Sequence, residues 1–403
     1  AASDVYKRQI GAVAMDLSRR DLLRSLGLLI AGGGMVGGTC VSGPFGKESS
    51  GARRIPLIHI TDLYHPPQDP DDQIDLATVL ALEEFDLKGV VLDITEDFLL
   101  EAPEGFDISR DPGHTPIAQM AHITGRSIPA AQGPIHQLTH PQDTCQDAPS
   151  EEQSGIGMIL DLLAESPDPV KISVTGSPRA LTAAYNREPA LMEEKTSVVL
   201  LNAGSTGGPK TEWNVQLDPN AYVGLWQSEL SIHWFPPGTD SGAFDPAHER
   251  GTFWKARHAD LFRGLPPRLQ GYFSYALSGD RNPDIIAALT EFGEGEDWQE
   301  DWQAILSNER NLWATASLVM GADRILANAE AGWRFLPGPE SRELEIWPWR
   351  LDPIQGDVDE KGAVTWEVRE GHIDRKIFGR KAGGEFGTAM TEALNALLRE
   401  MLP

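Results

Sequence analysis

The 403-residue chain has few cysteines and few basic residues. Its two cysteines, Cys40 and Cys145, are too few for a disulfide framework or a cysteine-based zinc site. Its 34 lysines and arginines stand against 60 acidic residues, so the formal net charge is −26. Because this charge repels phosphate backbones, we expect no nucleic-acid partner. The charge suits a protein that holds a cation or acts on a neutral or cationic small molecule, and an acidic solvated surface explains it equally well.

The N-terminal region lacks an apolar run long enough to span a bilayer. Its apolar segment, roughly residues 26–36, is short and rich in glycine. The segment follows Arg19 and Arg20 in MDLSRRDLL, which begins at Met15. This pattern resembles a twin-arginine export signal, and residues 1–14 are interpreted as an extension upstream of the natural start. We therefore expect an exported protein in the periplasm or another extracytoplasmic compartment.

Cys40 gives the signal region a second interpretation. The residue follows VGGT, which is similar to a lipoprotein cleavage box, although Thr39 stands where glycine or alanine is usual. Two outcomes stay open: a lipid anchor at Cys40, which would hold the protein at the membrane, and plain cleavage by signal peptidase. The predicted organisation is residues 1–40 as extension and signal, 41–54 as a linker of Gly, Ser and charge, and 55–403 as one domain.

Apolar runs alternate with helical patterns from residue 55 onward. The runs IPLIHIT, LKGVVLDI, VKISVTGS and TSVVLLNAG have the length of buried strands, and amphipathic segments separate them. This alternation predicts an α/β fold with an open, mostly parallel, Rossmann-like sheet and helices on both faces. Ligands of such sheets bind at the carboxyl ends of the strands. After residue 235 the pattern weakens: AVTWEVREGHIDRKIFGR suggests a hairpin, and GTAMTEALNALLREML an amphipathic terminal helix.

An acidic loop follows the first predicted strand. TDLYHPPQDPDDQID carries Asp62, Asp69, Asp71 and Asp72 between that strand and a helix. Helix capping accounts for one or two of these aspartates. Four carboxylates this close repel one another, and a hard cation with oxygen ligands relieves the repulsion. The residue types leave capping and metal binding both open.

Several segments resemble one protein family in their order and spacing. TD…DPDDQIDLATVLAL is similar to the start of the inosine–uridine-preferring nucleoside hydrolase superfamily, in particular to a divergent branch with a DPDDQ-type loop. VKISVTGSPRALTAA and VVLLNAGSTGGPKTEWNVQLDPNAY resemble later segments of that family. The resemblance covers roughly residues 55–240. It implies a nucleoside hydrolase-like fold, a Ca²⁺ cofactor, a nucleoside or another riboside as substrate, and a possible homo-oligomer.

The resemblance also implies roles for the acidic loop. Asp62 would be the catalytic base and a calcium ligand, and Asp69 is the alternative base because the loop is longer than the family's usual turn. Asp72 would bind calcium, and Asp71 would bind calcium or ribose. Thr175, after the strand VKISV, would offer its backbone carbonyl to the metal.

The expected substrate site includes residues farther along the chain. Glu212 and Asn214 occupy positions implied to bind ribose, and Trp213 between them would stack on a base or sugar. Where the family has a His-Asp pair at the start of a late buried helix, this sequence has Arg310 and Asn311. Asn311 would complete the calcium shell and Arg310 would face the substrate. An arginine cannot act as a general acid at neutral pH, so leaving-group activation differs or catalysis is weak.

Three functions follow from these patterns. The first is an exported calcium-dependent N-glycosidase that hydrolyses ribonucleosides or a related riboside, with a metal-bound water activated by an aspartate. The second is a catalytically weak or inactive relative that binds nucleosides or sugars, which Arg310 and Asn311 favour. The third is a divergent carbohydrate hydrolase, suggested by export and by the 11 tryptophans.

Overall fold

The computed structural model describes residues 53–67, 70–95, 111–208, 210–278, 282–290, 292–293, 298–338, 343–371 and 374–402. The predicted signal with Cys40, most of the predicted linker and Asp69 lie outside these ranges. Within them, no helix combines the length and the apolar character needed to cross a membrane.

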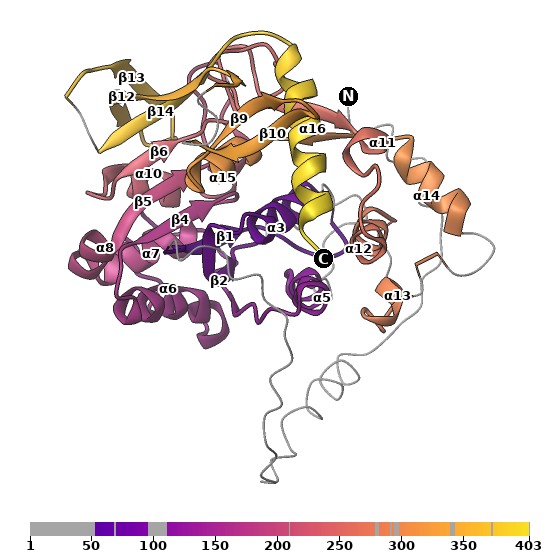
Figure 1. Cartoon of the computed structure of the whole chain (residues 1–403). Coiled ribbons are helices and arrows are strands. Elements are labelled where there is room, and N and C mark those ends of the chain that lie inside the picture. The colour runs from indigo at the N-terminus through magenta and orange to yellow at the C-terminus, as the bar shows by residue number, and fades with distance from the viewer. Residues whose placement is uncertain are drawn as a thin grey trace, which may run out of the picture.

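A nine-stranded sheet forms the centre of the molecule, with the strand order β13-β12-β14-β6-β5-β4-β1-β2-β3 (Figure 1). Its strands are β1 Ile55–Thr61, β2 Phe85–Leu92, β3 Ala130–Gln132, β4 Val170–Val174, β5 Thr196–Leu201, β6 Ile232–Trp234, β12 Trp349–Val358, β13 Val364–Val368 and β14 Arg375–Arg380. Strands β1 to β6 and β14 pair in parallel, and only β12 and β13 add antiparallel pairs. The expected open and mostly parallel sheet is confirmed.

Helices cover both faces of this sheet, because side chains alternate between the faces of each strand. Leu57 packs into one buried cluster together with helices α3 and α16, whereas Ile58 and Ile60 pack into a second cluster with α6, α7 and α10. The main helices are α3 Asp71–Ala81, α5 His114–Thr124, α6 Ser154–Glu165, α7 Arg179–Arg187, α8 Pro189–Lys195, α10 Pro219–Gln227, α15 Thr315–Gly321 and α16 Glu385–Glu400. Figure 1 shows α6, α7 and α8 together on one side, with α3 and α16 on the other.

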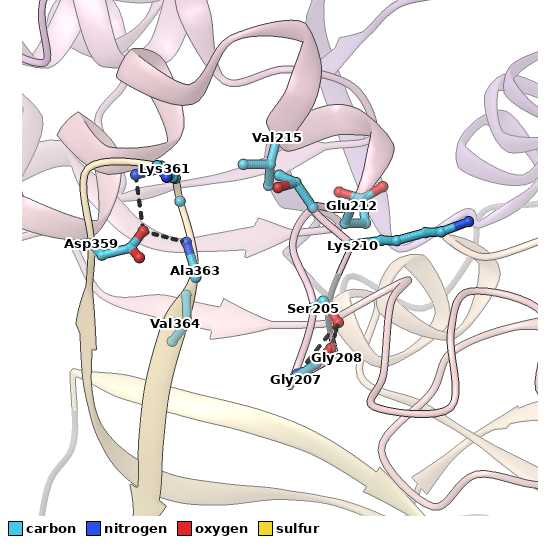
Figure 2. A pocket seen from close by; sticks show the side chains of 12 residues that line it. Ser205, Gly207, Gly208, Lys210, Glu212, Val215, Asp359, Lys361, Ala363 and Val364 are labelled. Atoms are coloured by element: carbon cyan, nitrogen blue, oxygen red, sulfur yellow. Dashed lines mark hydrogen bonds between the residues drawn. The ribbon is translucent and has the colours of Figure 1, made fainter.

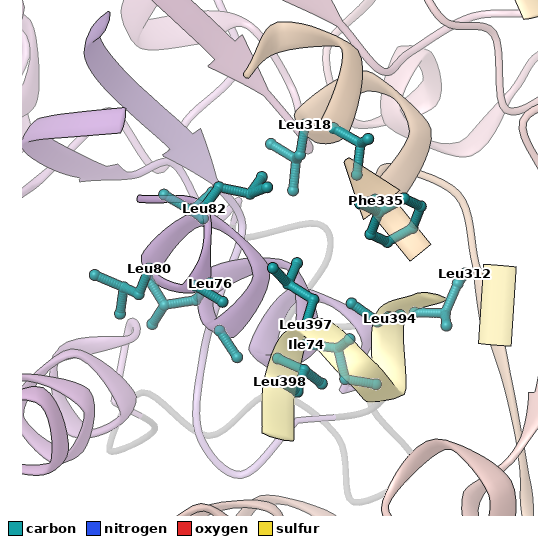
Figure 3. Close-up of a cluster of buried hydrophobic side chains, with 14 of the residues drawn as sticks. Ile74, Leu76, Leu80, Leu82, Leu312, Leu318, Phe335, Leu394, Leu397 and Leu398 are labelled. Carbon is teal, nitrogen blue, oxygen red and sulfur yellow. The ribbon is translucent and has the colours of Figure 1, made fainter. Parts of the chain in front are cut away.

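The C-terminal helix α16 is amphipathic, as predicted, and it packs against α3. Figure 3 shows Ile74 of α3 beside Leu394 and Leu398 of α16 in the larger buried cluster. The last helix of the chain therefore covers the helix that carries the acidic residues.

The hairpin predicted over residues 363–380 is wrong. Strands β13 and β14 do not pair with each other, because β12 lies between them and pairs antiparallel with both. The remaining elements are α9 Trp213–Leu217, α11 His258–Leu261, α12 Pro267–Ser278, α13 Ala287–Thr290, α14 Trp298–Leu306, the 3-10 helix Ser150–Gln153, a ribbon of β7 Trp254–Arg257 and β8 Glu309–Leu312, and a small sheet of β9 Arg324–Ala329, β10 Gly332–Pro337 and β11 Glu345–Ile346.

Candidate functional site

Polar residues follow four adjacent parallel strands at the same edge of the sheet. Asp62 follows β1, Asp93 follows β2, Thr175 follows β4 and Asn202 follows β5. Parallel strands present their carboxyl ends together, so the fold gathers these residues although they span more than a third of the chain. This edge is the candidate site.

Two carboxyl groups share its centre. Asp62 is only 4% exposed, and its carboxyl is hydrogen-bonded to that of Asp72, in the first turn of α3. Burial and the charge of Asp72 raise the pKa of Asp62 well above its ordinary value. A hydrogen bond between two carboxyl groups requires a proton on one of them, so this pair either keeps a proton or meets a cation.

The surroundings hold the two carboxyl groups in place. Asp72 Oδ1 accepts hydrogen bonds from the hydroxyls of Thr61, at 2.7 Å, and Thr175, at 3.2 Å. A Cβ atom at Gly176 would lie 2.8 Å from Asp62 Cγ, so a side chain there would collide with the carboxyl group. Three segments therefore meet at the Asp62–Asp72 pair: the end of β1, the loop after β4 and the start of α3.

The helix-cap interpretation is confirmed only in part, because Asp71 and Asp72 lie at the positive end of the helix dipole but neither is the N-cap residue. The N-cap residue of α3 is Pro70, which makes no side-chain cap hydrogen bond, and Asp71 and Asp72 both lie inside the first turn. Asp75, one turn later, was missed in the sequence although its spacing puts it on the same face of the helix as Asp72. It is buried, its Oδ1 has no hydrogen-bond partner among the residues that the structure describes, and burial together with the charge of Asp72 raises its pKa well above the ordinary value.

A second group of residues is tied to Thr175. The Asn214 side-chain amide donates to the backbone carbonyls of Thr175, at 3.2 Å, and Asn202, at 3.0 Å. The Glu212 carboxyl accepts hydrogen bonds from the backbone amides of Gly204, at 2.7 Å, and Asn214, at 3.1 Å. Glu212 therefore caps the N-terminus of α9. These bonds bring together segments that were predicted from the sequence to bind metal and ribose.

Burial raises the pKa of Glu212 to about 7, against the hydrogen bonds from backbone amides that lower it. Near neutral pH this side chain is therefore present in both protonation states. Trp213, beside it at the start of α9, is 37% exposed, which is enough for its indole to contact a ligand.

Asn202 was also missed in the sequence. Its side-chain amide donates to the Val174 carbonyl at 3.0 Å, which joins β4 to β5. Its buried Oδ1 has no hydrogen-bond partner within the described part of the chain. A polar residue directly after a buried parallel strand was the signal that could have identified it.

Asp93 is held differently, by a buried ion pair. Arg179 Nη2 donates to the Asp93 carbonyl at 2.7 Å and to Asp93 Oδ1 at 3.1 Å, and the Ala180 amide donates to Oδ2 at 3.0 Å. Burial raises the pKa of Asp93, while the guanidinium and the amide lower it again. Both side chains are completely buried.

Arg310 and Asn311 do not begin the late buried helix, and that expectation is wrong. Both residues lie in β8, and α15 begins at Thr315. Asn311 lies opposite Lys255 in the β7–β8 ribbon, and Arg310 Nε is 3.4 Å from His258 Nε2. Pairing with β7 keeps residues 309–312 extended, so the helix starts later. The ribbon lies against α3 through β8.

The described part of the chain has no group of three His, Cys, Asp or Glu side chains arranged to hold a metal ion. What the site offers a hard cation is the carboxylates of Asp62 and Asp72 and the backbone carbonyl of Thr175, all oxygen donors. The close contact of the two carboxyls fits a cation, because a positive charge would replace the proton that they otherwise share.

A small cavity adjoins Glu212. Its volume is about 210 Å³, and it lies between the loop from Ser205 to Glu212 and the turn from Asp359 to Val364 that joins β12 to β13 (Figure 2). The candidate site thus continues past Glu212 toward the added strands of the sheet.

Comparisons with known proteins found similarity in structure alone. No family model matches the chain, and no curated protein matches it in sequence. Among solved structures, a purine-preferring ribonucleoside hydrolase from Gardnerella vaginalis is 14% identical, with a TM-score of 0.46, 85% of this chain covered and 99% of that one. An inosine-uridine preferring nucleoside hydrolase from Bacillus anthracis is 13% identical, with a TM-score of 0.47 and coverage of 86% and 99%. A plant nucleoside hydrolase is 14% identical, with a TM-score of 0.47 and coverage of 86% and 98%.

Proposed function

We propose that this chain hydrolyses the N-glycosidic bond of a ribonucleoside or a related riboside. One observation carries the proposal: hydrogen bonds join the Asp62–Asp72 pair, through Thr175, to Asn214 and Glu212. Acidic groups and hydroxyl-binding groups therefore occupy one edge of the sheet, where ligands of parallel sheets bind. Cleavage of a glycosidic bond requires both kinds of group, since positive charge develops on the sugar.

Each residue has a role in this reaction. Asp62 takes the proton of the attacking water, for which its carboxylate form is needed. The water oxygen bonds to the sugar carbon as the bond between that carbon and the base nitrogen breaks. The electrons of the broken bond leave with the base, which takes a proton from solvent, and the neighbouring carboxylate of Asp72 stabilises the positive charge on the sugar. Glu212 and Asn214 orient the sugar hydroxyls. Arg310 does not supply the proton that the leaving base takes up, because its guanidinium stays protonated.

A calcium ion is part of this proposal. Asp62, Asp72 and the Thr175 carbonyl would hold it, with Asp71 of the same turn as a further carboxylate. When bound, calcium would supply the positive charge that lowers the pKa of a water molecule and of the adjacent carboxyls. Asn311 lies in strand β8 of the β7–β8 ribbon, and it is a calcium ligand only if its side-chain oxygen reaches the ion.

The test is release of free base from inosine and uridine by the full chain, with calcium and with chelator. Asp62→Asn and Asp72→Asn are expected to lose at least 100-fold in turnover. The control Asp161→Asn removes an exposed aspartate of α6 and is expected to keep full turnover. Absence of base release by the unmodified chain, with and without calcium, would contradict the proposal.

A second candidate function uses the same site: the chain would bind ribosides without cleaving them. Arg310, in β8, favours this binding function, because an arginine cannot supply a proton to the leaving base. Calorimetry with uridine separates the two. Binding without base release, weakened by Asn214→Ala, is the result expected for a binding protein.

We also propose that the chain is exported by the twin-arginine route, which Arg19 and Arg20 before a short apolar segment support. Replacing both arginines by lysine should retain the protein in the cytoplasm, as measured by cell fractionation. An unchanged distribution would contradict this route. Lipidation at Cys40 and self-association stay predictions.

A further inference from the structure

Two tryptophan side chains hold the loop that follows β5. Trp234, in β6, donates from its indole N–H to the Ala203 carbonyl at 2.7 Å. Trp366, in β13, donates from its indole N–H to the Thr206 carbonyl at 3.1 Å. Because both acceptors are backbone carbonyls, these bonds restrain the path of the loop itself, at a point on either side of Gly204.

Gly204 connects this loop to the candidate site. Its amide donates to Glu212 Oε2 at 2.7 Å. Its φ is 91°, and a Cβ at this position would collide with the hydroxyl of Tyr222, so a glycine is required here. The conformation of the loop therefore sets the direction of the amide that holds the Glu212 carboxyl.

The β12–β13 hairpin reaches this loop by packing along α10. A Cβ at Gly356 of β12 would lie 3.4 Å from the ring of Trp226, near the end of α10. At the turn of the hairpin, a Cβ at Gly362 would collide with Val215 of α9, whose side chain points toward the turn in Figure 2. The hairpin thus lies against both helices, and Trp366 on its second strand meets the loop after β5.

Two neighbours fix the orientation of the Trp366 ring. Trp366 and Trp234 form a T-shaped pair with ring centroids 6.4 Å apart. The guanidinium of Arg250 lies over the Trp366 ring, 5.5 Å from its centre, and Arg250 is itself held by an ion pair with Asp352 at 2.6 Å. A ring restrained in this way keeps its N–H directed at the Thr206 carbonyl.

The opposite side of the loop is attached to a different part of the fold. The Thr206 amide donates to the Gly238 carbonyl and the Gly238 amide to the Gly204 carbonyl, each at 3.1 Å. These two bonds tie the loop to the segment after β6. The hairpin joins the loop to α9, because it contacts Thr206 through Trp366 and Val215 through Gly362.

We infer that Trp366 is a positioning residue, which holds the loop after β5 so that the Gly204 amide keeps the Glu212 carboxyl in place to bind the sugar. The effect on ligand binding rests on the proposed function, because Glu212 must contact the sugar. The Asp62–Asp72 pair is held by β1, α3 and the loop after β4, so we expect Trp366 to affect sugar binding more than turnover.

The first test is the change Trp366→Phe, which removes the indole N–H and keeps an aromatic ring. Calorimetry on the full chain measures the affinity for ribose, which turnover does not consume. The dissociation constant is expected to rise about 2- to 10-fold, the loss typical of one hydrogen bond, and kcat for uridine is expected to change less than KM. The matched control is Trp347→Phe, because Trp347 is buried and its indole N–H has no hydrogen-bond partner among the described residues.

The second test needs no ligand. The hydrogen bond from the Gly204 amide lowers the pKa of Glu212, which burial raises to about 7. Trp366→Phe loosens this bond, so the titration midpoint of Glu212 is expected to move upward, while Trp347→Phe leaves it unchanged. NMR of glutamate labelled with ¹³C at the carboxyl group measures the midpoint, and Glu212→Gln assigns the signal.

The two tests separate failure of the inference from failure of the proposed function. An unchanged Glu212 midpoint in Trp366→Phe would overturn the inference, whatever happens to ribose affinity. Equal changes in Trp366→Phe and Trp347→Phe would also overturn it, since they would reflect a general loosening of the fold. A shifted midpoint in a chain that binds no ribose would support the positioning of Glu212 and would contradict the proposed function.

Discussion

Strands β1 and β2 are neighbours in the sheet, and each ends in a buried aspartate with a different partner. Asp93, after β2, is paired with Arg179 and accepts a backbone amide. Asp62, after β1, has the carboxyl of Asp72 as its partner. Both aspartates are less than 5% exposed, so burial penalises their charge to a similar extent. The compensation for that penalty is what differs.

The difference separates an acid that the fold accounts for from one that the proposed function would account for. The guanidinium of Arg179 neutralises Asp93, so the fold itself accounts for that residue. The Asp62–Asp72 pair brings like charges together and opposes folding unless a proton or a cation intervenes. Arrangements that cost stability without a structural gain are expected at functional sites. The following changes test this comparison, from the largest expected effect to the smallest.

Arg179→Met should destabilise the protein most. It leaves Asp93 buried without a partner, and breaking a buried pair costs about 3–5 kcal/mol. Urea denaturation measures the loss in free energy of unfolding. The control is Arg263→Met, which breaks the exposed pair with Asp260 and should cost about 0–1 kcal/mol. Similar losses for the two variants would show that the Asp93 pair is not a structural element.

Calcium should stabilise the site at Asp62 and leave the Asp93 pair unaffected. A cation that binds only the folded state adds about 2.7 kcal/mol at 100 times its dissociation constant. Thermal unfolding with calcium and with chelator measures this effect. It should vanish in Asp72→Asn and persist in Asp161→Asn. Equal stabilisation of both variants would place the calcium elsewhere.

Asp72→Asn without calcium should not destabilise the protein, unlike Arg179→Met. The amide still accepts the hydroxyls of Thr61 and Thr175, and it removes the repulsion that raises the pKa of Asp62. We expect stability to be unchanged or to rise, because the repulsion that raises the pKa of Asp62 is removed, while turnover is lost. A clear loss of stability in urea denaturation would mean that the pair supports the fold.

Glu212→Gln should flatten the pH dependence of stability. The pKa of Glu212 is about 7 in the folded protein and near 4.5 when unfolded, so the folded state holds more protons in between. Its contribution is present below pH 4.5 and is lost as the pH rises to 7, with a slope well under about 1.4 kcal/mol per pH unit for a partly exposed side chain. Urea denaturation across this range should show a flatter curve for Glu212→Gln and an unchanged one for Glu165→Gln, an exposed residue of α6. Parallel curves for Glu212→Gln and the unmodified chain would contradict the shift.

Much of the central fold was predictable from the sequence. Local hydrophobic patterns predict single elements: the apolar runs of strand length predicted β1, β2, β4 and β5. Their alternation with amphipathic segments predicted the parallel sheet. Asp62 and Thr175 come directly after two of those strands, and this position predicted that both lie at one edge of the sheet.

The chain by itself therefore determined the alternation of strands and helices and the edge at which a ligand would bind. Only the tertiary structure decided the partners of these residues: Arg179 for Asp93, Asp72 for Asp62, and strand β7 for Arg310 and Asn311. It also placed β12 between β13 and β14, where the sequence suggested a hairpin. Periodicity depends on neighbours a few residues away, whereas the pairing of Asp93 with Arg179 joins residues 86 positions apart. The order of strands in the sheet creates such pairings, and no local pattern encodes that order.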